Sequence, residues 1–251
     1  MNHIREQLYD LGLMPGDVML MHSSMKALQT ELTPKNFLLE LMQALTEKGT
    51  LLLPALTYET VTFENPFFSI TKSEPCVGIL PKTFMKMKKV TRSMHPTHSV
   101  CAWGANSYTM TVKHFRDKTP VGLNSPFMLL PEFNGKILFI GDILYSCTFM
   151  HGIEEVVCAP YVMNKKMTRY TLEDATKTTI AKKYYTHNFK GWKQEYTRIR
   201  DVLEYPDIRT GTICNAHCTL IDAGKLKTAA IERFQSDLYA FVSPLPGEHS
   251  V

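Results

Sequence analysis

The stretch that decides the fold runs from residue 18 to residue 56 and contains VMLMHSS (18–24), PKNFLLELMQALTEK (34–48) and TLLLPAL (50–56). The outer two segments are short apolar runs, which predict buried strands. The middle segment repeats apolar residues at helical spacing, begins with a proline and is followed directly by Gly49. This order of strand, helix and strand predicts an α/β fold in which helices flank a central, mostly parallel sheet.

Further elements extend this pattern along the chain. Helices are predicted over residues 2–11, 78–89, 148–157 and 222–242, and strands over 99–104 and 136–142. The segment 57–75 is polar and aromatic, contains the breakers ENP and SEP, and is predicted to be a long loop. The segment 168–189 alternates weakly, as a hairpin or an insertion would. Because no repeat, low-complexity tract or linker interrupts the sequence, we expect a single domain over residues 1–251.

The composition is that of an ordinary soluble globular protein. Of the 251 residues, 44% are hydrophobic and 21% are charged. No apolar run approaches the roughly 20 residues that span a bilayer. The opening MNHIREQLYDLG is typical of an amphipathic helix rather than of a signal peptide. We therefore expect a cytoplasmic protein without a membrane partner.

The cysteines and the basic residues favour neither a metal centre nor a nucleic-acid surface. The six cysteines are scattered and mostly lie in apolar surroundings, which is typical of reduced, buried thiols. Cys214 and Cys218 flank His217, but no second pair stands at zinc-binding spacing, so no metal is expected. The net charge is +4, and the lysines of segment 82–89 predict a solvated helix face or a landing place for phosphates. Interleaved aromatic residues, the mark of a nucleic-acid surface, are missing there.

Polar side chains lie at the ends of three of the predicted strands. The segments are HSS (22–24), HPTHS (95–99), and GD (141–142) with the TFMHGIEE helix (148–155) after it. In open α/β sheets, ligands bind beyond the carboxyl ends of the strands, so these segments are expected to line one pocket. From the sequence, His95 and His98 serve equally well as ligand contacts or as structural groups that satisfy loop carbonyls.

The predicted helix over 148–157 carries a histidine with two acidic neighbours. His151 lies three residues before Glu154 and four before Glu155, so either carboxylate can lie one turn along the same face. Such a carboxylate fixes the tautomer of the imidazole and makes it a general base near neutral pH. The same spacing also describes a solvated pair on a surface helix, and the spacing does not choose between the two.

Several reaction classes lack their sequence signals. Ser23, Ser24 and Ser99 lie outside any G-x-S-x-G elbow, which favours hydrogen-bond donors over the nucleophile of a serine hydrolase. The sequence contains neither G-x-x-x-x-G-K-[ST] nor G-x-G-x-x-G. This argues against nucleotide hydrolysis and dinucleotide redox chemistry.

From about residue 8 to residue 161 the chain resembles the aminoglycoside 3-N-acetyltransferase family of antibiotic N-acetyltransferases. The resemblance depends on successive segments in register, and NAHCTLIDAGKL (215–226) is similar to the family's closing motif. The segments are LGLMPGDVMLMHSS (11–24), GTLLLPALTY (49–58), NPF (65–67), VGILPKTF (77–84), RSMHPTHSVCAWG (92–104), SPF (125–127), KILFIGD (136–142) and TFMHGIEE (148–155).

The resemblance implies a single α/β fold and direct transfer of an acetyl group from acetyl-CoA to an amine. It implies that His151 is the general base and that Glu154 supports it. It also implies that two segments contribute donors and positive charge to the acetyl-CoA side of the pocket. The residues concerned are His22, Ser23, Ser24, Arg92, Ser93, His98 and Ser99.

An aminoglycoside is a polycation, so its cleft is expected to carry carboxylates. The acidic residues expected to meet the acceptor are Glu59, Glu64, Glu74, Asp142 and Glu155. The chain is nevertheless net basic, and segment 162–212 is rich in lysine and arginine, so another amino sugar or a small amine competes as acceptor. The alternative function is a catalytically silent relative that binds CoA or a nucleotide sugar. The expected partner is a small-molecule amine, and a homodimer is the candidate assembly.

Overall fold

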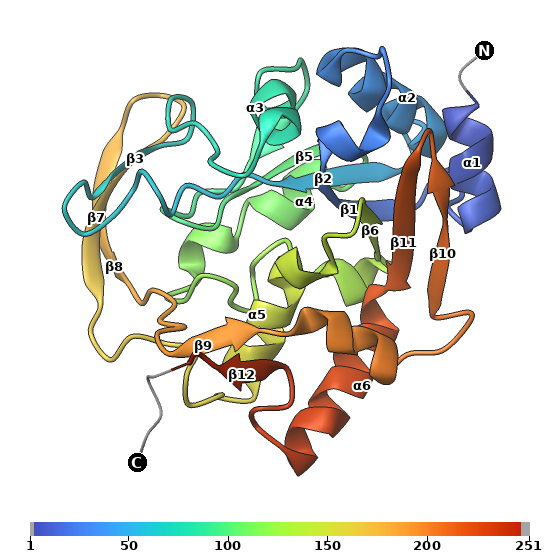
Figure 1. The fold of residues 1–251 in the computed structure, drawn as a ribbon. Helices are drawn as coiled ribbons and strands as arrows, with labels where there is room; N and C mark the ends of the chain where they lie inside the picture. The colour runs from blue at the N-terminus through green and yellow to red at the C-terminus, as the bar shows by residue number, and fades with distance from the viewer. Residues whose placement is uncertain (1–2, 247–251) are drawn as a thin grey trace.

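A mixed seven-stranded sheet forms the centre of the fold, in a computed structural model that describes residues 3–246 (Figure 1). Its strand order is β10-β11-β6-β1-β2-β5-β4. The strands within the described residues are β1 (Val18–Ser23), β2 (Thr50–Pro54), β3 (Phe67–Ser69), β4 (Thr91–Arg92), β5 (Val100–Gly104), β6 (Lys136–Ile140), β7 (Thr168–Glu173), β8 (Thr179–Tyr184), β9 (Trp192–Gln194), β10 (Ile208–Ile213), β11 (Ala216–Asp222) and β12 (Val242–Pro244). The α-helices are α1 (Ile4–Leu11), α2 (Pro34–Leu45), α3 (Ile79–Met85), α4 (Ser107–Thr111), α5 (Thr148–Val156) and α6 (Ala223–Ser236). Short 3₁₀ helices span Met25–Leu28, His114–Arg116, Leu130–Phe133, Leu144–Ser146 and Tyr196–Asp201.

The α/β class is confirmed, whereas the prediction of a mostly parallel sheet is wrong. Strand β1 runs parallel to both of its neighbours, β2 and β6. The pairs β2–β5, β4–β5, β6–β11 and β10–β11 are antiparallel. The parallel pair β1–β2 is connected by a crossover that contains a helix. Only Cys214 and Asn215 separate β10 from β11, and so short a connection permits only an antiparallel hairpin.

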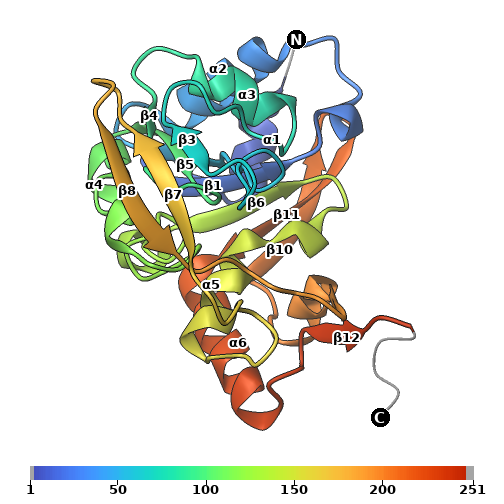
Figure 2. The same cartoon turned by 90° about the vertical axis from the view of Figure 1, so that its left-hand side faces the viewer.

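Helices cover both faces of this sheet, as Figure 2 shows, with α1, α2 and α3 on one side and α5 and α6 on the other. Side chains of β1 alternate between the two cores. Met19 and Met21 pack in the cluster that contains α1, α2 and α3, and Val18 and Leu20 pack in the cluster with α5 and α6. Because β1 is buried on both faces, its carboxyl end is the first place where its side chains reach open space.

Two smaller sheets stand beside the main one. Strands β3, β7 and β8 form the first, in which β7 and β8 are an antiparallel hairpin, one of the two alternatives for segment 168–189. Strands β9 and β12 form the second. The prediction that 57–75 is a loop throughout is wrong, because β3 lies within it and pairs in parallel with β7, about a hundred residues later in the chain.

The predicted helix boundaries need two corrections. The helix predicted over 78–89 ends at Met85, and Lys89 has a left-handed φ of 62° that a helix cannot contain. The helix predicted over 222–242 ends at Ser236, after which the chain reaches β12. Lys86 pairs with Glu74 at 2.8 Å, in agreement with a solvated face for the lysines of segment 82–89.

Two further features of the structure concern the cysteines and the apolar character of the helices. All six cysteines are free, but the prediction that they are buried holds only for Cys101, Cys147 and Cys218, and Cys158 is exposed. Within residues 3–246, no helix combines the length and the apolar character needed to cross a membrane.

Candidate active site

A cavity of about 890 Å³ opens where β1 ends, and segments far apart in the sequence line it. Strand β1 delivers His22 and Ser23, and α5 delivers His151. His98 lies just before β5, and since β5 runs antiparallel to β2, its amino end lies at the edge where β1 and β2 have their carboxyl ends. His187 follows β8. The ends of β1, β5 and β8, together with α5, therefore gather several imidazoles around one cavity.

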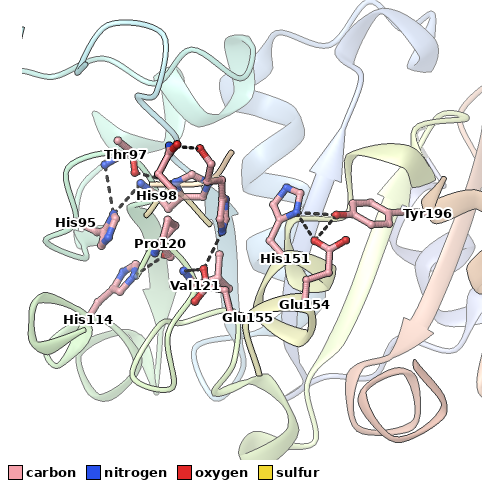
Figure 3. A network of polar contacts seen from close by, with 12 residues as sticks. His95, Thr97, His98, His114, Pro120, Val121, His151, Glu154, Glu155 and Tyr196 are labelled. Atoms are coloured by element: carbon pink, nitrogen blue, oxygen red, sulfur yellow. Dashed lines mark hydrogen bonds and ion pairs between the residues drawn. The ribbon is translucent and has the colours of Figure 1, made fainter. Parts of the chain in front are cut away.

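Two groups hold the ring of His151 in place (Figure 3). Its Nδ1 lies 2.7 Å from the hydroxyl of Tyr196 and 3.2 Å from Oε2 of Glu154. Tyr196 donates to the same Oε2 at 2.7 Å, and Tyr161 donates to Oε1 at 3.0 Å. Glu154 is fully buried, so this carboxylate finds its partners entirely within the protein.

This arrangement fixes which nitrogen of His151 can act as a base. Burial, and then the neighbouring Glu154, raise the pKa of Tyr196 well above its usual value, so the phenol keeps its proton. The phenol of Tyr196 has one proton, which it donates to Oε2 of Glu154. Nδ1 of His151 therefore carries the ring proton and donates toward the oxygens of Tyr196 and Glu154. Nε2 then carries the lone pair, and the structure gives it no partner among residues 3–246. The ring lines the cavity, so Nε2 is the atom available to a bound molecule.

A second histidine and carboxylate pair lies beside the first. Nε2 of His187 is 2.7 Å from Oε1 of Glu155, which also accepts the backbone N–H of Val121 at 2.9 Å. The ring centroid of His187 lies 4.9 Å from that of His151 and 4.8 Å from that of His98. Burial raises the pKa of Glu155 to about 7. His187 was not predicted from the sequence, because nothing in its neighbourhood marks it and only the return of the hairpin brings it to the cavity.

The other imidazoles of the cavity are neutral at physiological pH. Burial, helped by the proximity of His151, lowers the pKa of His22 to about 3, and its ring stacks on Phe139 with 5.0 Å between centroids. Burial lowers the pKa of His98 well below 6.5, and the nearby histidines His187 and His151 lower it further. These rings offer hydrogen-bond donors and acceptors without adding charge.

Four of the seven residues assigned to the acetyl-CoA side line this cavity: His22, Ser23, Ser24 and His98. The hydroxyl of Ser24 also accepts the N–H of Ala27 at 3.3 Å and caps the 3₁₀ helix Met25–Leu28. The structure thus brings the end of β1 together with His151, as the strand-end argument predicts.

The other three residues, Arg92, Ser93 and Ser99, do not line the cavity, and their polar atoms bond within the protein. Arg92 donates to the hydroxyl of Ser99 at 2.9 Å and to the carbonyls of Ser73 and Ala55 at 2.6 and 3.1 Å. Burial lowers the pKa of Arg92 to about 10. The guanidinium therefore ties β4 and β5 to the segment before α3.

Ser93 has a similar internal role. Its hydroxyl accepts the N–H of Val100 at 2.9 Å and lies 2.8 Å from Nδ1 of His114. Both Ser93 and His114 are fully buried. For Arg92, Ser93 and Ser99, contact with acetyl-CoA stays a prediction that the geometry does not favour.

None of the acidic residues assigned to the acceptor lines the cavity. Glu59, Glu64 and Asp142 are exposed, and Asp142 lies 3.6 Å from the guanidinium of Arg200. Glu155 stands behind His187, to which it is bonded. The lining of this cavity, as far as residues 3–246 define it, contains no carboxylate.

Comparison of the sequence with known proteins identifies one family. The family model for aminoglycoside 3-N-acetyltransferase matches residues 20–235. Aminoglycoside N(3)-acetyltransferase VII of Streptomyces paromomycinus is 26% identical over 175 residues, which cover 62% of this chain and 60% of that protein.

Solved structures show the same fold. A mutant of aminoglycoside acetyltransferase AAC(3)-IVa in complex with a gentamicin matches with a TM-score of 0.81 and 23% identity, over 96% of this chain and 90% of that one. AAC-IIIb in a binary complex with CoASH matches with a TM-score of 0.81 and 22% identity, over 97% of both chains. The family match covers most of the sequence, and the chain therefore belongs to the aminoglycoside 3-N-acetyltransferase family of acyltransferase enzymes.

Proposed function

We propose that the protein transfers the acetyl group of acetyl-CoA to a primary amine, with His151 as the general base. The observation that carries the proposal is the orientation of the His151 ring. Its Nδ1 is bound by Tyr196 and Glu154, and its Nε2 is left without a partner in the cavity wall. The family resemblance by itself implies an aminoglycoside or another amino sugar as acceptor, and the function proposed here requires only a primary amine.

His151 supplies what this reaction needs from a base. An amine attacks a carbonyl only through a free lone pair, and it must lose a proton as the new C–N bond forms. Nε2 of His151 accepts that proton and returns it to the sulfur when the C–S bond breaks, so that an amide and a free thiol leave. Glu154 stabilises the imidazolium between these two transfers, since it is held close to Nδ1 by Tyr196 and Tyr161.

The residues around β1 fit the thioester. Attack on the carbonyl builds negative charge on its oxygen, and positioned donors stabilise that charge. Nε2 of His22 is buried without a hydrogen-bond partner in the described chain, and the residue lines the cavity. The hydroxyls of Ser23 and Ser24 lie at the same strand end. When bound, acetyl-CoA supplies the activated acyl group. The CoA complex of AAC-IIIb, a structure of the same fold, supports this assignment.

Two measurements on the purified protein test the proposal. Calorimetric titration with acetyl-CoA is expected to show binding, and a thiol-release assay is expected to show turnover that requires an amine. Binding without thiol release for any amine would favour the catalytically silent alternative. Absence of acetyl-CoA binding would contradict both.

A further inference from the structure

Four of the aromatic side chains that line the cavity with His151 lie among hydroxyl-bearing residues such as Thr62 and Thr168, and we call these four the aromatic wall. Tyr58 and Phe63 come from the segment before β3, Tyr170 comes from β7, and Phe189 follows β8. Phe63 is 73% exposed and Tyr58 is 46% exposed, so both present apolar surface to solvent at this cavity. Large exposed aromatic side chains around a cavity mark a binding surface for an apolar ligand.

Charge is nearly absent from the same wall. Among residues 3–246, Lys26 is the one lysine, arginine, aspartate or glutamate that lines the cavity. The two carboxylates nearest to His151 already have partners, since Glu154 accepts from Tyr196 and Tyr161 and Glu155 is bonded to His187. The imidazoles of His22, His98 and His187 are held neutral by burial.

A cavity lining of this kind is expected to bind a polycation weakly. An aminoglycoside carries several ammonium groups, and each one that leaves water without a carboxylate partner costs several kcal/mol. The faces of Tyr58, Phe63 and Phe189 can compensate one cation, at about 0.5–2 kcal/mol for a cation–π contact. One ammonium group, which the base must deprotonate in any case, is therefore accommodated, and several are not.

We infer that the acceptor is an amine with a single ammonium group on an aromatic or aliphatic body, rather than a polycationic aminoglycoside. This inference rests on the proposed function, because it names the acceptor of the same site. The aromatic wall binds the body of the acceptor, and His151 receives the proton of its nitrogen.

A panel of three acceptors tests the inference through kcat/KM in the thiol-release assay. The acceptors are 2-phenylethylamine, with one ammonium group on an aromatic body, glucosamine, with one on a polar body, and gentamicin, a polycation. We expect 2-phenylethylamine to exceed gentamicin at least tenfold, with glucosamine between them. A value for gentamicin or glucosamine at or above that of 2-phenylethylamine would overturn the inference.

A substitution that adds a carboxylate tests whether the aromatic wall determines the preference among acceptors. Phe63→Glu places a carboxylate at the exposed aromatic position and is expected to shift the ratio of kcat/KM tenfold or more toward gentamicin. Tyr108→Glu is the matched control, since Tyr108 is 68% exposed on α4 and does not line the cavity. Equal ratios in the two variants would show that this wall does not select the acceptor.

Calorimetry of each amine in the presence of CoA separates this inference from the proposed function. Tighter binding of 2-phenylethylamine without any acetylation would overturn the proposed function, and with it the acceptor role, but would keep the preference of the cavity for a singly charged amine. Acetylation with gentamicin as the tighter ligand would keep the function and overturn the inference. Failure of all three amines to bind would overturn both.

Discussion

The hydroxyl of Tyr196 donates a 2.7 Å hydrogen bond to Oε2 of Glu154 across 42 residues of sequence. The same hydroxyl lies 2.7 Å from Nδ1 of His151, so one phenol joins the carboxylate and the imidazole. Tyr196 begins the 3₁₀ helix Tyr196–Asp201 and is fully buried. The orientation of the histidine on α5 thus depends on a segment that the chain adds only after the β7–β8 hairpin.

Loss of the His151 imidazole is expected to abolish most of the turnover. His151→Ala should lower kcat by about two to four orders of magnitude, as is typical for loss of a general acid or base, while acetyl-CoA binding stays nearly unchanged. Thiol release and calorimetry measure the two quantities. The control is His217→Ala, because His217 is exposed on β11, outside the cavity. Normal turnover of His151→Ala would show that another group is the base.

The two tyrosines that contact Glu154 are expected to differ in their effect on catalysis. Tyr196→Phe removes the hydroxyl shared with His151 and should lower kcat about tenfold to a hundredfold, as expected for loss of a hydrogen bond to a charged group. Tyr161→Phe removes only the contact at Oε1 of Glu154 and should lower kcat less, with a comparable loss of thermal stability. Equal losses of kcat in the two variants would mean that Tyr196 does not position the ring.

Glu155 is expected to make stability fall as the pH rises. Its folded pKa is raised by burial from 4.5 to about 7, so the native state binds more protons than the unfolded chain between these values. Its contribution to the free energy of unfolding is therefore full below pH 4.5 and lost as the pH passes 7. Relative to wild type, Glu155→Gln should gain roughly 2–3 kcal/mol in stability between pH 5 and pH 8. Urea unfolding at both pH values measures it.

The matched control for that experiment is Glu132→Gln, since Glu132 is exposed at the 3₁₀ helix Leu130–Phe133. Its stability should track that of wild type at both pH values. A parallel pH profile for Glu155→Gln and wild type would contradict the raised pKa of this buried carboxyl.

The buried histidines are expected to make the protein labile in acid. Burial lowers the pKa of His22 and of His114 to about 3, so below pH 6.5 the unfolded chain binds protons that the native state excludes. Each such histidine should cost about 1.4 kcal/mol of stability per pH unit below 6.5. His114→Asn should reduce this slope, and His217→Asn, at an exposed position, should leave it unchanged. An unchanged slope in His114→Asn would contradict the assignment.

Arg92 is expected to serve the fold rather than the cofactor. Arg92→Met should lower the free energy of unfolding by about 2–4 kcal/mol, because the carbonyls of Ser73 and Ala55 lose their donor. The KM for acetyl-CoA, measured on folded protein, should stay the same. Arg116→Met, at an exposed arginine, is the control for loss of charge. A raised KM with unchanged stability would restore the cofactor role implied by the resemblance.

Local patterns of sequence predicted the elements that bury a continuous apolar face. The strand that contains β6 and the helix α5 are both found where apolar runs and helical spacing indicate them. The direction of each strand could not be predicted from the sequence, because it depends on the path by which long connections bring the chain back to the sheet. The three residues of β3 were missed because their partner, β7, is distant in the sequence.

The positions of polar residues at strand ends predicted part of the site. His22, Ser23, Ser24, His98 and His151 share a cavity because strand ends meet at one edge of the sheet. Arg92 was expected to bind an anion. Its residue type indicates how many hydrogen bonds it can donate, but not which groups accept them. The roles of these residues in catalysis and binding stay predictions, as does the single domain over residues 1–251.

The proposed proton-transfer pair and part of the cavity lining come from different parts of the molecule. His151 and Glu154 belong to α5, packed against the main sheet, whereas Tyr170 and His187 come with the β7–β8 hairpin of the separate three-stranded sheet. On the proposed assignment, the parts that select the acceptor and that transfer the proton are therefore structurally separable. Substitutions on the hairpin would change the residues that meet the acceptor, while Glu154 keeps its hydrogen bonds to Tyr196 and Tyr161.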